Sequence, residues 1–257
     1  MPSLRFASLG SGSQGNALVV QSGGTLVLLD CGFSITSVTA RLGRLGLGPG
    51  QIDAVVVTHE HDDHIGGVAR FALRFGVPVW LSYGTLRGFE PFFAGVRVNI
   101  LENFSAFSVG SLRIEPYPVP HDAREPAQYV FDDGARRLGV LTDAGESTRI
   151  IEQTLSGCEA LVVECNHDPE MLAKSSYPQQ VKDRIASRVG HLDNQAAADL
   201  LARLDTSHLQ HVVAAHLSRQ NNRPELARSA LSGVLGCRPD WIGVADQDAG
   251  FDWLAIA

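Results

Sequence analysis

The chain has 257 residues, of which 44% are apolar, and it can bury the core of a single α/β domain spanning residues 1–257. Its net charge of −7 argues against a general nucleic-acid coat protein, which carries a basic face, but not against an enzyme acting on nucleic acid. The longest apolar runs are strand-length, so no membrane association is expected. Scattered cysteines and an N-terminus without an apolar signal region predict a cytoplasmic protein with reduced thiols.

Strand-like and helix-like segments alternate along the chain, which is typical of an α/β domain. In the first part the expected elements are strands over 4–9, 17–21 and 25–29, a helix over 34–47, a strand over 54–57, a helix over 65–75 and a strand over 77–81. After an irregular stretch over 89–102, a candidate lid or partner surface, strands are expected over 112–119, 128–131, 138–141 and 161–163. The last expected elements are a helix over 194–204, a strand over 212–215, a helix over 225–235, and strands over 241–244 and 251–256.

The most specific motif is Thr58–His64, which reads Thr-His-Glu-His-Asp-Asp-His and follows a buried strand. His59 and His61 alternate on an extended loop, so both imidazoles can turn toward one ion, while Asp63 and His64 project toward a second ion nearby. Imidazole and carboxylate together suit Zn²⁺, Mn²⁺ or Fe²⁺. A loop of merely solvated polar residues is disfavoured, because chance rarely spaces metal-ligand types in this way.

Polar side chains also follow the ends of several predicted strands. These residues are Asp30, His59, His121, Asp143, Glu164 and His216. In α/β architectures, ligand-binding and catalytic groups collect at the carboxyl ends of strands. One site assembled from all these positions explains a pattern that separate core residues would not.

The motif Thr58–His64, with Asp30, His121, Asp143 and His216 in that order, resembles the metallo-β-lactamase superfamily. The resemblance implies a four-layer αββα sandwich of the metallo-β-lactamase type, with two divalent metal ions at one edge of its sheets. Further segments resemble the YycJ-like (WalJ-like) branch, namely Gly10–Asn16, Glu164–Asp168, Gly190–Asn194 and Ala215–Asn222. Members of that branch are described as metal-dependent exonucleases acting from the 5′ ends of duplex DNA, so this activity is expected here.

The resemblance also implies a role for each ligand. The implied ligands are His59, His61 and His121 for the first ion, Asp63, His64 and His216 for the second, and Asp143 as a bridge. Two ions about 3.5–4 Å apart can bind a shared hydroxide as the nucleophile and clamp a phosphate from both sides of an in-line displacement. Asp30 is expected to orient the ligand loop through hydrogen bonds. Taken alone, His121 could instead cap a turn, and Asp143 could form an Asx turn.

Cleavage of a phosphodiester also requires a proton donor for the leaving oxygen. The expected catalytic residues are Asp63, Glu164 and His191. By similarity to related tRNA-processing endonucleases, Glu164 would orient His191 and raise its pKa, and the imidazolium would donate the proton. The alternative role for His191 is support of a helix N-terminus at Asp193 or Asn194.

Two loops could hold a substrate phosphate. Ser11–Asn16 is a glycine-rich turn whose backbone N–H groups can form an anion-binding nest, although such a turn usually only connects strands. Ser218–Asn222 precedes a helix that Asn221 or Asn222 is expected to cap, and a helix N-terminus favours an anion. The candidate substrate-binding residues are Asn16, Asn166, His167, Ser218, Asn221 and Asn222.

The favoured function is therefore a two-metal phosphodiester hydrolase, specifically a 5′→3′ exonuclease on double-stranded DNA. The alternative is a small-molecule hydrolase on the same fold, such as a cyclic or aryl phosphodiesterase, a thioesterase or a lactonase. A metal-binding scaffold without activity is disfavoured, because the ligand set is complete. The native metal (Mn²⁺ or Zn²⁺, with Fe²⁺ as a further candidate) and any protein partner stay open. The basic residues over 174–188 are expected to form a solvated helix face rather than a phosphate clamp.

Overall fold

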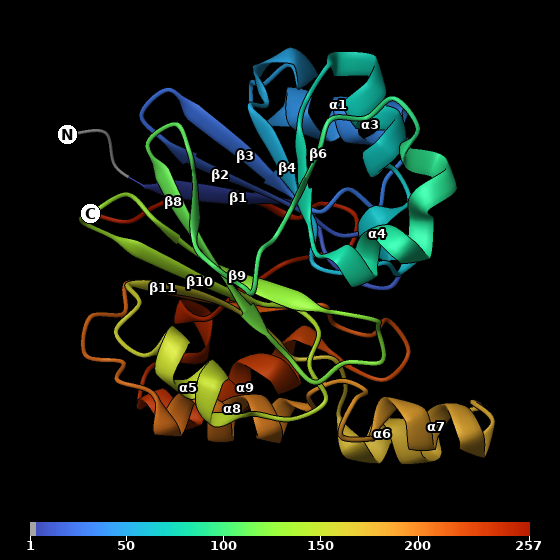
Figure 1. Cartoon of the computed structure of the whole chain (residues 1–257). Coiled ribbons are helices and arrows are strands. Elements are labelled where there is room, and N and C mark those ends of the chain that lie inside the picture. The colour runs from blue at the N-terminus through green and yellow to red at the C-terminus, as the bar shows by residue number, and fades with distance from the viewer. Residues whose placement is uncertain (1–3) are drawn as a thin grey trace.

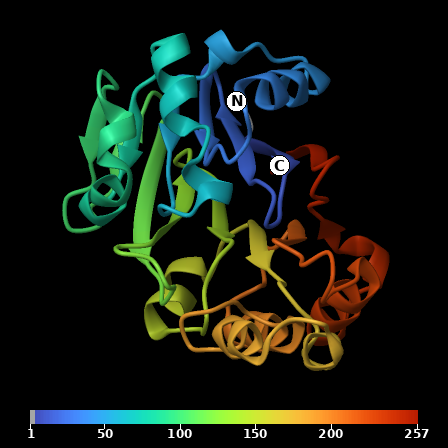
Figure 2. The same ribbon diagram turned by 90° about the vertical axis from the view of Figure 1, so that its right-hand side faces the viewer.

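Two seven-stranded β-sheets pack face to face in the computed structural model, which describes residues 4–257 (Figure 1). Helices cover the outer face of each sheet, so the layers follow the order helix, sheet, sheet, helix (Figure 2). This arrangement confirms the predicted four-layer sandwich. Within the described residues, no helix combines the length and the apolar character that a membrane crossing demands.

The first sheet has the strand order β14-β1-β2-β3-β4-β5-β6. Its strands are β1 (Arg5–Gly10), β2 (Ala17–Ser22), β3 (Thr25–Leu29), β4 (Ala54–Val56), β5 (Val79–Leu81), β6 (Val98–Ile100) and β14 (Phe251–Ala255). The helices on its outer face are α1 (Ile35–Arg44) and α3 (Val68–Phe75). Because β3 to β6 run parallel, the loops that follow β3 and β4 leave the sheet at the same edge.

The second sheet has the strand order β13-β12-β11-β10-β9-β8-β7. Its strands are β7 (Phe107–Val109), β8 (Leu112–Pro118), β9 (Ala127–Asp132), β10 (Arg137–Leu141), β11 (Ala160–Glu164), β12 (His211–Ala215) and β13 (Gly243–Val244). The helices on its outer face are α5 (Arg149–Leu155), α8 (Asn194–Arg203) and α9 (Pro224–Leu235). The strands β10 to β13 are parallel, so the residues that follow β10, β11 and β12 also share one edge.

Alternate residues of a strand face different layers of the sandwich. In β3, Val27 and Leu29 belong to the core between the sheets, whereas Leu26 and Leu28 pack under the outer helices. A strand that is buried on both faces reads as a continuous apolar run. The polar residues that follow such strands therefore lie at the edge of the sandwich, where the core ends.

The remaining helices lie toward this edge. They are α2 (Asp62–Ile65), α4 (Tyr83–Phe89), α6 (Pro169–Lys174) and α7 (Gln179–Ile185). In Figure 1, α6 and α7 form an arm that extends outward beside the second sheet. The sequence pattern does not predict α4, α5, α6 or α7.

Several element predictions are wrong in detail. The expected helix over 65–75 is divided at Gly66 and Gly67 into α2 and α3. A Cβ on Gly67 would lie 2.0 Å from the carbonyl oxygen of Phe33, so the chain turns here to pack against its neighbour. The expected strand over 241–244 is shorter, because Trp241 ends a 3₁₀ turn before β13. The stretch over 89–102 holds a 3₁₀ turn and β6, and its Phe92 is 61% exposed.

Candidate metal centre

The loop after β4 is held in place by Asp30. Asp30 Oδ1 accepts a hydrogen bond from the Thr58 N–H at 2.8 Å, and Oδ2 accepts one from the Thr58 hydroxyl at 2.9 Å. Asp30 Oδ2 also lies 2.8 Å from His64 Nδ1. Asp30 has a φ of 59°, in the left-handed region that costs non-glycine residues about 1–3 kcal/mol. These contacts are the ones expected for a residue that orients the ligand loop.

Three imidazoles converge at the first group of predicted ligands, because ring nitrogens of His59, His61 and His121 lie within 4.8 Å of one another. His61 Nδ1 is 3.0 Å from His59 Nε2 and 3.3 Å from His121 Nε2. The outer nitrogens are occupied, since His59 Nδ1 lies 2.9 Å from Thr58 Oγ1 and His121 Nδ1 lies 3.0 Å from Gly190 O. An imidazole whose outer nitrogen is fixed by an oxygen presents the lone pair of its inner nitrogen, as metal ligands do.

The second group consists of Asp63, His64 and His216, whose ligand atoms also lie within 4.8 Å of one another. Asp143 lies between the groups, with Oδ2 3.1 Å from His64 Nε2 and Oδ1 3.9 Å from His121 Nε2. His216 directly follows β12 and has a left-handed φ of 54°. The fold thus brings all the predicted ligands to one place. Their division between two ions stays a prediction.

The donor set fits divalent cations. Asp143 Oδ2 and His216 Nε2 are buried, and among residues 4–257 neither makes a well-formed hydrogen bond, although Asp143 Oδ2 has His64 Nε2 at 3.1 Å and His216 Nε2 has Asp63 Oδ2 at 3.4 Å. A buried polar atom without a partner costs about 1–3 kcal/mol, and a cation between the two groups would satisfy both atoms. Imidazole nitrogens together with carboxylate oxygens are ligands that Zn²⁺ and Mn²⁺ accept, so these residues are suited to hold metal.

The electrostatics of the centre also favour cations. Burial alone would lower the pKa of His64, but the carboxylates of Asp143 and Asp63 outweigh burial and raise that pKa well above its usual range. Burial likewise tends to raise the pKa of Asp143, yet the neighbouring His216 and His64 hold it well below its usual range. The carboxylates therefore create a negative potential at the centre, which divalent cations would neutralise.

Glu164 ends β11 and holds His191 beside the ligand groups. Glu164 Oε1 lies 2.7 Å from His191 Nδ1, and Oε2 accepts hydrogen bonds from the N–H groups of Ala144 and Leu192 at 2.9 and 3.1 Å. Burial would lower the pKa of His191, but Glu164 outweighs burial and raises it. The His191 side chain is 22% exposed, so a substrate can reach it. The pair expected from the sequence is formed, and Asp193 caps α8 as one of the two expected residues.

The predicted substrate-binding residues are almost all buried. Exposed fractions between 1 and 5% are found for Asn16, Asn166, His167, Asn221 and Asn222, whereas Ser218 is half-buried. Asn222 exchanges amide hydrogen bonds of 2.9 Å with Asn194 and donates another to Cys165 O at 2.7 Å. Such side chains hold loops together, and their burial argues against direct contact with substrate. The expected helix cap by Asn221 or Asn222 is wrong, because α9 begins after Arg223.

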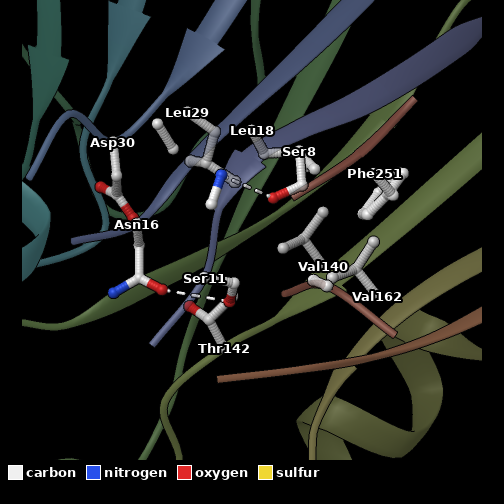
Figure 3. A pocket seen from close by; sticks show the side chains of 13 residues that line it. Ser8, Ser11, Asn16, Leu18, Leu29, Asp30, Val140, Thr142, Val162 and Phe251 are labelled. Atoms are coloured by element: carbon white, nitrogen blue, oxygen red, sulfur yellow. Dashed lines mark hydrogen bonds between the residues drawn. The ribbon is translucent and has the colours of Figure 1, made fainter. Parts of the chain in front are cut away.

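The glycine-rich loop over 11–16 supports the second ligand group. Asn16 Oδ1 accepts hydrogen bonds from Ser11 Oγ at 3.1 Å and Gly12 N at 2.8 Å, and Asn16 Nδ2 lies 3.1 Å from His64 Nε2. Ser11 Oγ in turn accepts from His216 N at 2.9 Å. The expected anion nest is already partly occupied by these side chains. Behind the loop, a cavity of about 20 Å³ lies between the sheets, and Figure 3 shows Asn16 and Ser11 at its rim.

A pocket of about 450 Å³ opens over the centre, and Asp63, Asp143, His191 and His216 form one part of its lining. Another part consists of Tyr177, Val181, Arg184 and Ile185 from the arm. The sequence reasoning misses these arm residues. The sequence feature that could have indicated them is the four-residue spacing between Tyr177, Val181 and Ile185.

Known proteins resemble this chain over most of its length. A family model described as the metallo-beta-lactamase superfamily matches residues 10–161. Exodeoxyribonuclease YycJ of Bacillus anthracis is 37% identical over 235 residues, which cover 90% of this chain and 89% of that protein. Exodeoxyribonuclease WalJ of Streptococcus pneumoniae is 30% identical over 245 residues, which cover 93% and 91%.

Solved structures share the fold at much lower identity. The metallo-beta-lactamase fold protein YhfI from Bacillus subtilis matches with a TM-score of 0.77, covering 99% of this chain and 100% of that chain at 14% identity. The short form of human tRNase Z matches with a TM-score of 0.67, covering 98% and 99% at 16% identity. At such identities the likeness concerns the fold alone.

Proposed function

This chain belongs to the metallo-beta-lactamase superfamily and is a metal-dependent hydrolase, and we propose that it is a 5′→3′ exonuclease on double-stranded DNA. The observation that carries the proposal is the Glu164–His191 pair beside clustered His and Asp side chains that could hold metal ions. These side chains occur in a chain 37% identical, over 90% of its length, to a protein named an exodeoxyribonuclease.

Each of the two ligand groups would hold one metal ion. One ion would be held by His59, His61 and His121, the other by Asp63, His64 and His216, with Asp143 between them. When bound, the ions would supply positive charge opposite the phosphate and lower the pKa of a water molecule. Asp30 occupies the outer nitrogen of His64 and Thr58 that of His59, so the inner nitrogens of these two imidazoles would be available to the ions.

His191 is the proposed proton donor for the leaving oxygen. Its Nδ1 is held by Glu164 at 2.7 Å, which leaves Nε2 as the atom that can deliver a proton to the substrate. Both oxygens of Glu164 have partners, so the carboxylate cannot turn away. The carboxylate therefore favours the protonated imidazole, because it raises the pKa of His191, and it holds the ring in one orientation.

The test uses duplex DNA that is phosphorylated at the 5′ end and labelled at the 3′ end, incubated with the Mn²⁺-loaded protein. Progressive shortening of the labelled strand is expected, whereas digestion from the 3′ end would release the label at once. His61→Ala should abolish the shortening. His208→Ala removes an exposed imidazole outside the centre, and this variant should still shorten the DNA.

Failure to shorten DNA with either Mn²⁺ or Zn²⁺, in protein shown to hold two ions, would reject the nuclease. Turnover of a small aryl phosphodiester by that same protein would then favour the small-molecule hydrolase.

A further inference from the structure

The arm helix α7 carries apolar side chains that do not reach the core. None of the residues Gln179–Ile185, all of which the structure describes, is buried. Val181 and Ile185 are four positions apart within the helix and so share one face, and Tyr177 just before the helix lines the same pocket as these two residues. Val181 is 39% exposed. We call these three residues the α7 stripe.

The α7 stripe faces the pocket of the metal centre. Tyr177, Val181 and Ile185 line the same cavity of about 450 Å³ as Asp143 and His191. The pocket therefore has one wall of imidazoles and carboxylates and another wall with an aromatic ring and aliphatic side chains. A ligand that fits both walls has a charged part and a flat apolar part, and the volume lies in the usual range for small-molecule sites.

The basic residues of this segment are already paired within the protein. Lys174 contacts Glu170, Lys182 donates to Ala173 O at 2.7 Å, Arg184 pairs with Asp122, and Arg188 pairs with Glu146. Of these four cations only Arg184 lines the pocket, and its charge is opposed by Asp122. The other arm residues of the pocket, Tyr177, Val181 and Ile185, add apolar surface.

The stripe is held at a fixed position relative to the proton donor. The His191 N–H donates to Ile185 O at 2.9 Å, so the end of the stripe is bonded to the backbone of His191 itself. A Cβ on Gly190 would lie 2.2 Å from the carbonyl oxygens of Arg184 and Ile185, so only glycine permits this close approach. Arg184 adds its ion pair with Asp122, beside His121. The wall is thus preorganised rather than loosely attached.

We infer that the α7 stripe is a subsite for the base of the nucleotide whose phosphate lies at the metal centre, with the Tyr177 ring as the stacking surface. Every nucleobase has an apolar face, so stacking on an aromatic ring favours nucleotides over other phosphoesters without selecting a sequence. The inference deepens the proposed nuclease function and rests on its phosphodiester substrate.

The test compares two ligands of the full-length, Mn²⁺-loaded protein by calorimetry: thymidine 5′-monophosphate and methyl phosphate, which lacks the base. The wild-type protein should bind the nucleotide about tenfold more tightly, as expected for one stacked base. Tyr177→Ala should remove this preference, Tyr177→Phe should retain it, and Val181→Ala should reduce it. Val234→Ala is the matched control, because Val234 is a helical valine that is 40% exposed on α9.

The binding test separates this inference from the nuclease proposal. Equal affinities of the wild-type protein for the two ligands, or a preference that survives both Tyr177→Ala and Val181→Ala, would overturn the subsite. DNA left intact by a protein that retains a Tyr177-dependent preference would reject the exonuclease and leave the subsite standing. Metal content measured for each variant excludes an indirect loss of the centre.

Discussion

Asp143 contacts both ligand groups of the metal centre. Its Oδ2 lies 3.1 Å from His64 Nε2 in the second group, and its Oδ1 lies 3.9 Å from His121 Nε2 in the first group. The neighbouring imidazoles keep its pKa well below the usual range, so the side chain is an anion at neutral pH. An amide of the same shape would lack the charge that two adjacent cations require.

Asp143→Asn is therefore expected to bind fewer than two ions and to lose affinity for metal by at least about 100-fold. Titration calorimetry with elemental analysis measures both quantities. Asp62→Asn makes the same change on the exposed side of the ligand loop and should bind metal normally. Two tightly bound ions and full activity in Asp143→Asn would show that the bridge is assigned to the wrong residue.

His191 acts on the substrate rather than on the metal in this scheme. His191→Ala should keep its ions but lose about 10²–10⁴-fold in turnover of substrates with poor leaving groups, because general acid catalysis contributes about that much. An activated aryl phosphodiester needs little protonation and should be affected far less. A series of aryl esters of graded leaving-group pKa measures the effect, and equal losses across the series would argue against a proton donor.

At the scale of elements, the glycine-rich loop joins the C-terminal segment to the metal centre. Gln247 Nε2 donates to Gly15 O at 2.8 Å, and Gln247 Oε1 accepts from Gln14 N at 2.8 Å. Gly12 beside Gln247 has a φ of 143°, a backbone conformation that favours glycine. Through Asn16, the same loop reaches the ligand His64.

Gln247→Ala should thus weaken the metal centre, although Gln247 does not contact the metal ligands. Loss of the amide leaves two backbone groups of the loop without their partner, and the free energy of unfolding should fall by about 1–3 kcal/mol. Metal affinity should weaken in parallel, because the loop that positions Asn16 beside His64 is less firmly held. Chemical denaturation and metal titration test this, with Gln153→Ala on the exposed face of α5 as the control. Unchanged stability together with unchanged metal affinity would contradict the link.

At the scale of the whole molecule, the metal centre joins the two sheets. The ligand loop after β4 belongs to the first sheet, whereas Asp143 and His216 follow strands of the second. Cations bound between them would cross-link the two halves of the sandwich. Binding to the folded state alone stabilises it by about 2.7 kcal/mol when free metal is 100 times the Kd.

Removal of metal by a chelator should therefore lower the Tm by about 5–10 °C for a chain of this size. Addition of Mn²⁺ or Zn²⁺ should restore the Tm, and the increase should depend on metal concentration. Differential scanning calorimetry measures the shift. Equal Tm values with and without metal would mean that the centre does not link the sheets in this way.

Much of the fold and of the centre could be predicted because the signals are local. The apolar runs that form β3, β11 and β12 lie within single segments, and the polar residue after each marks the sheet edge. The spacing within Thr58–His64 places ligand types on one loop, whatever the rest of the chain does. The pair of Glu164 and His191 came from the family resemblance, and the structure places the two in contact.

The chemistry of the centre was thus determined by the sequence, because residue type and short-range spacing decide which donors are available. The access of substrate to the centre and the contacts that support its loops were decided only by the tertiary structure. Packing between separate segments buries Asn16 and Asn221 and directs the α7 stripe at the pocket. It also brings Gln247 into hydrogen bonds with the glycine-rich loop, which is far away in the sequence. Local sequence patterns do not record such contacts, because they form only when the two sheets and the arm have closed around the centre.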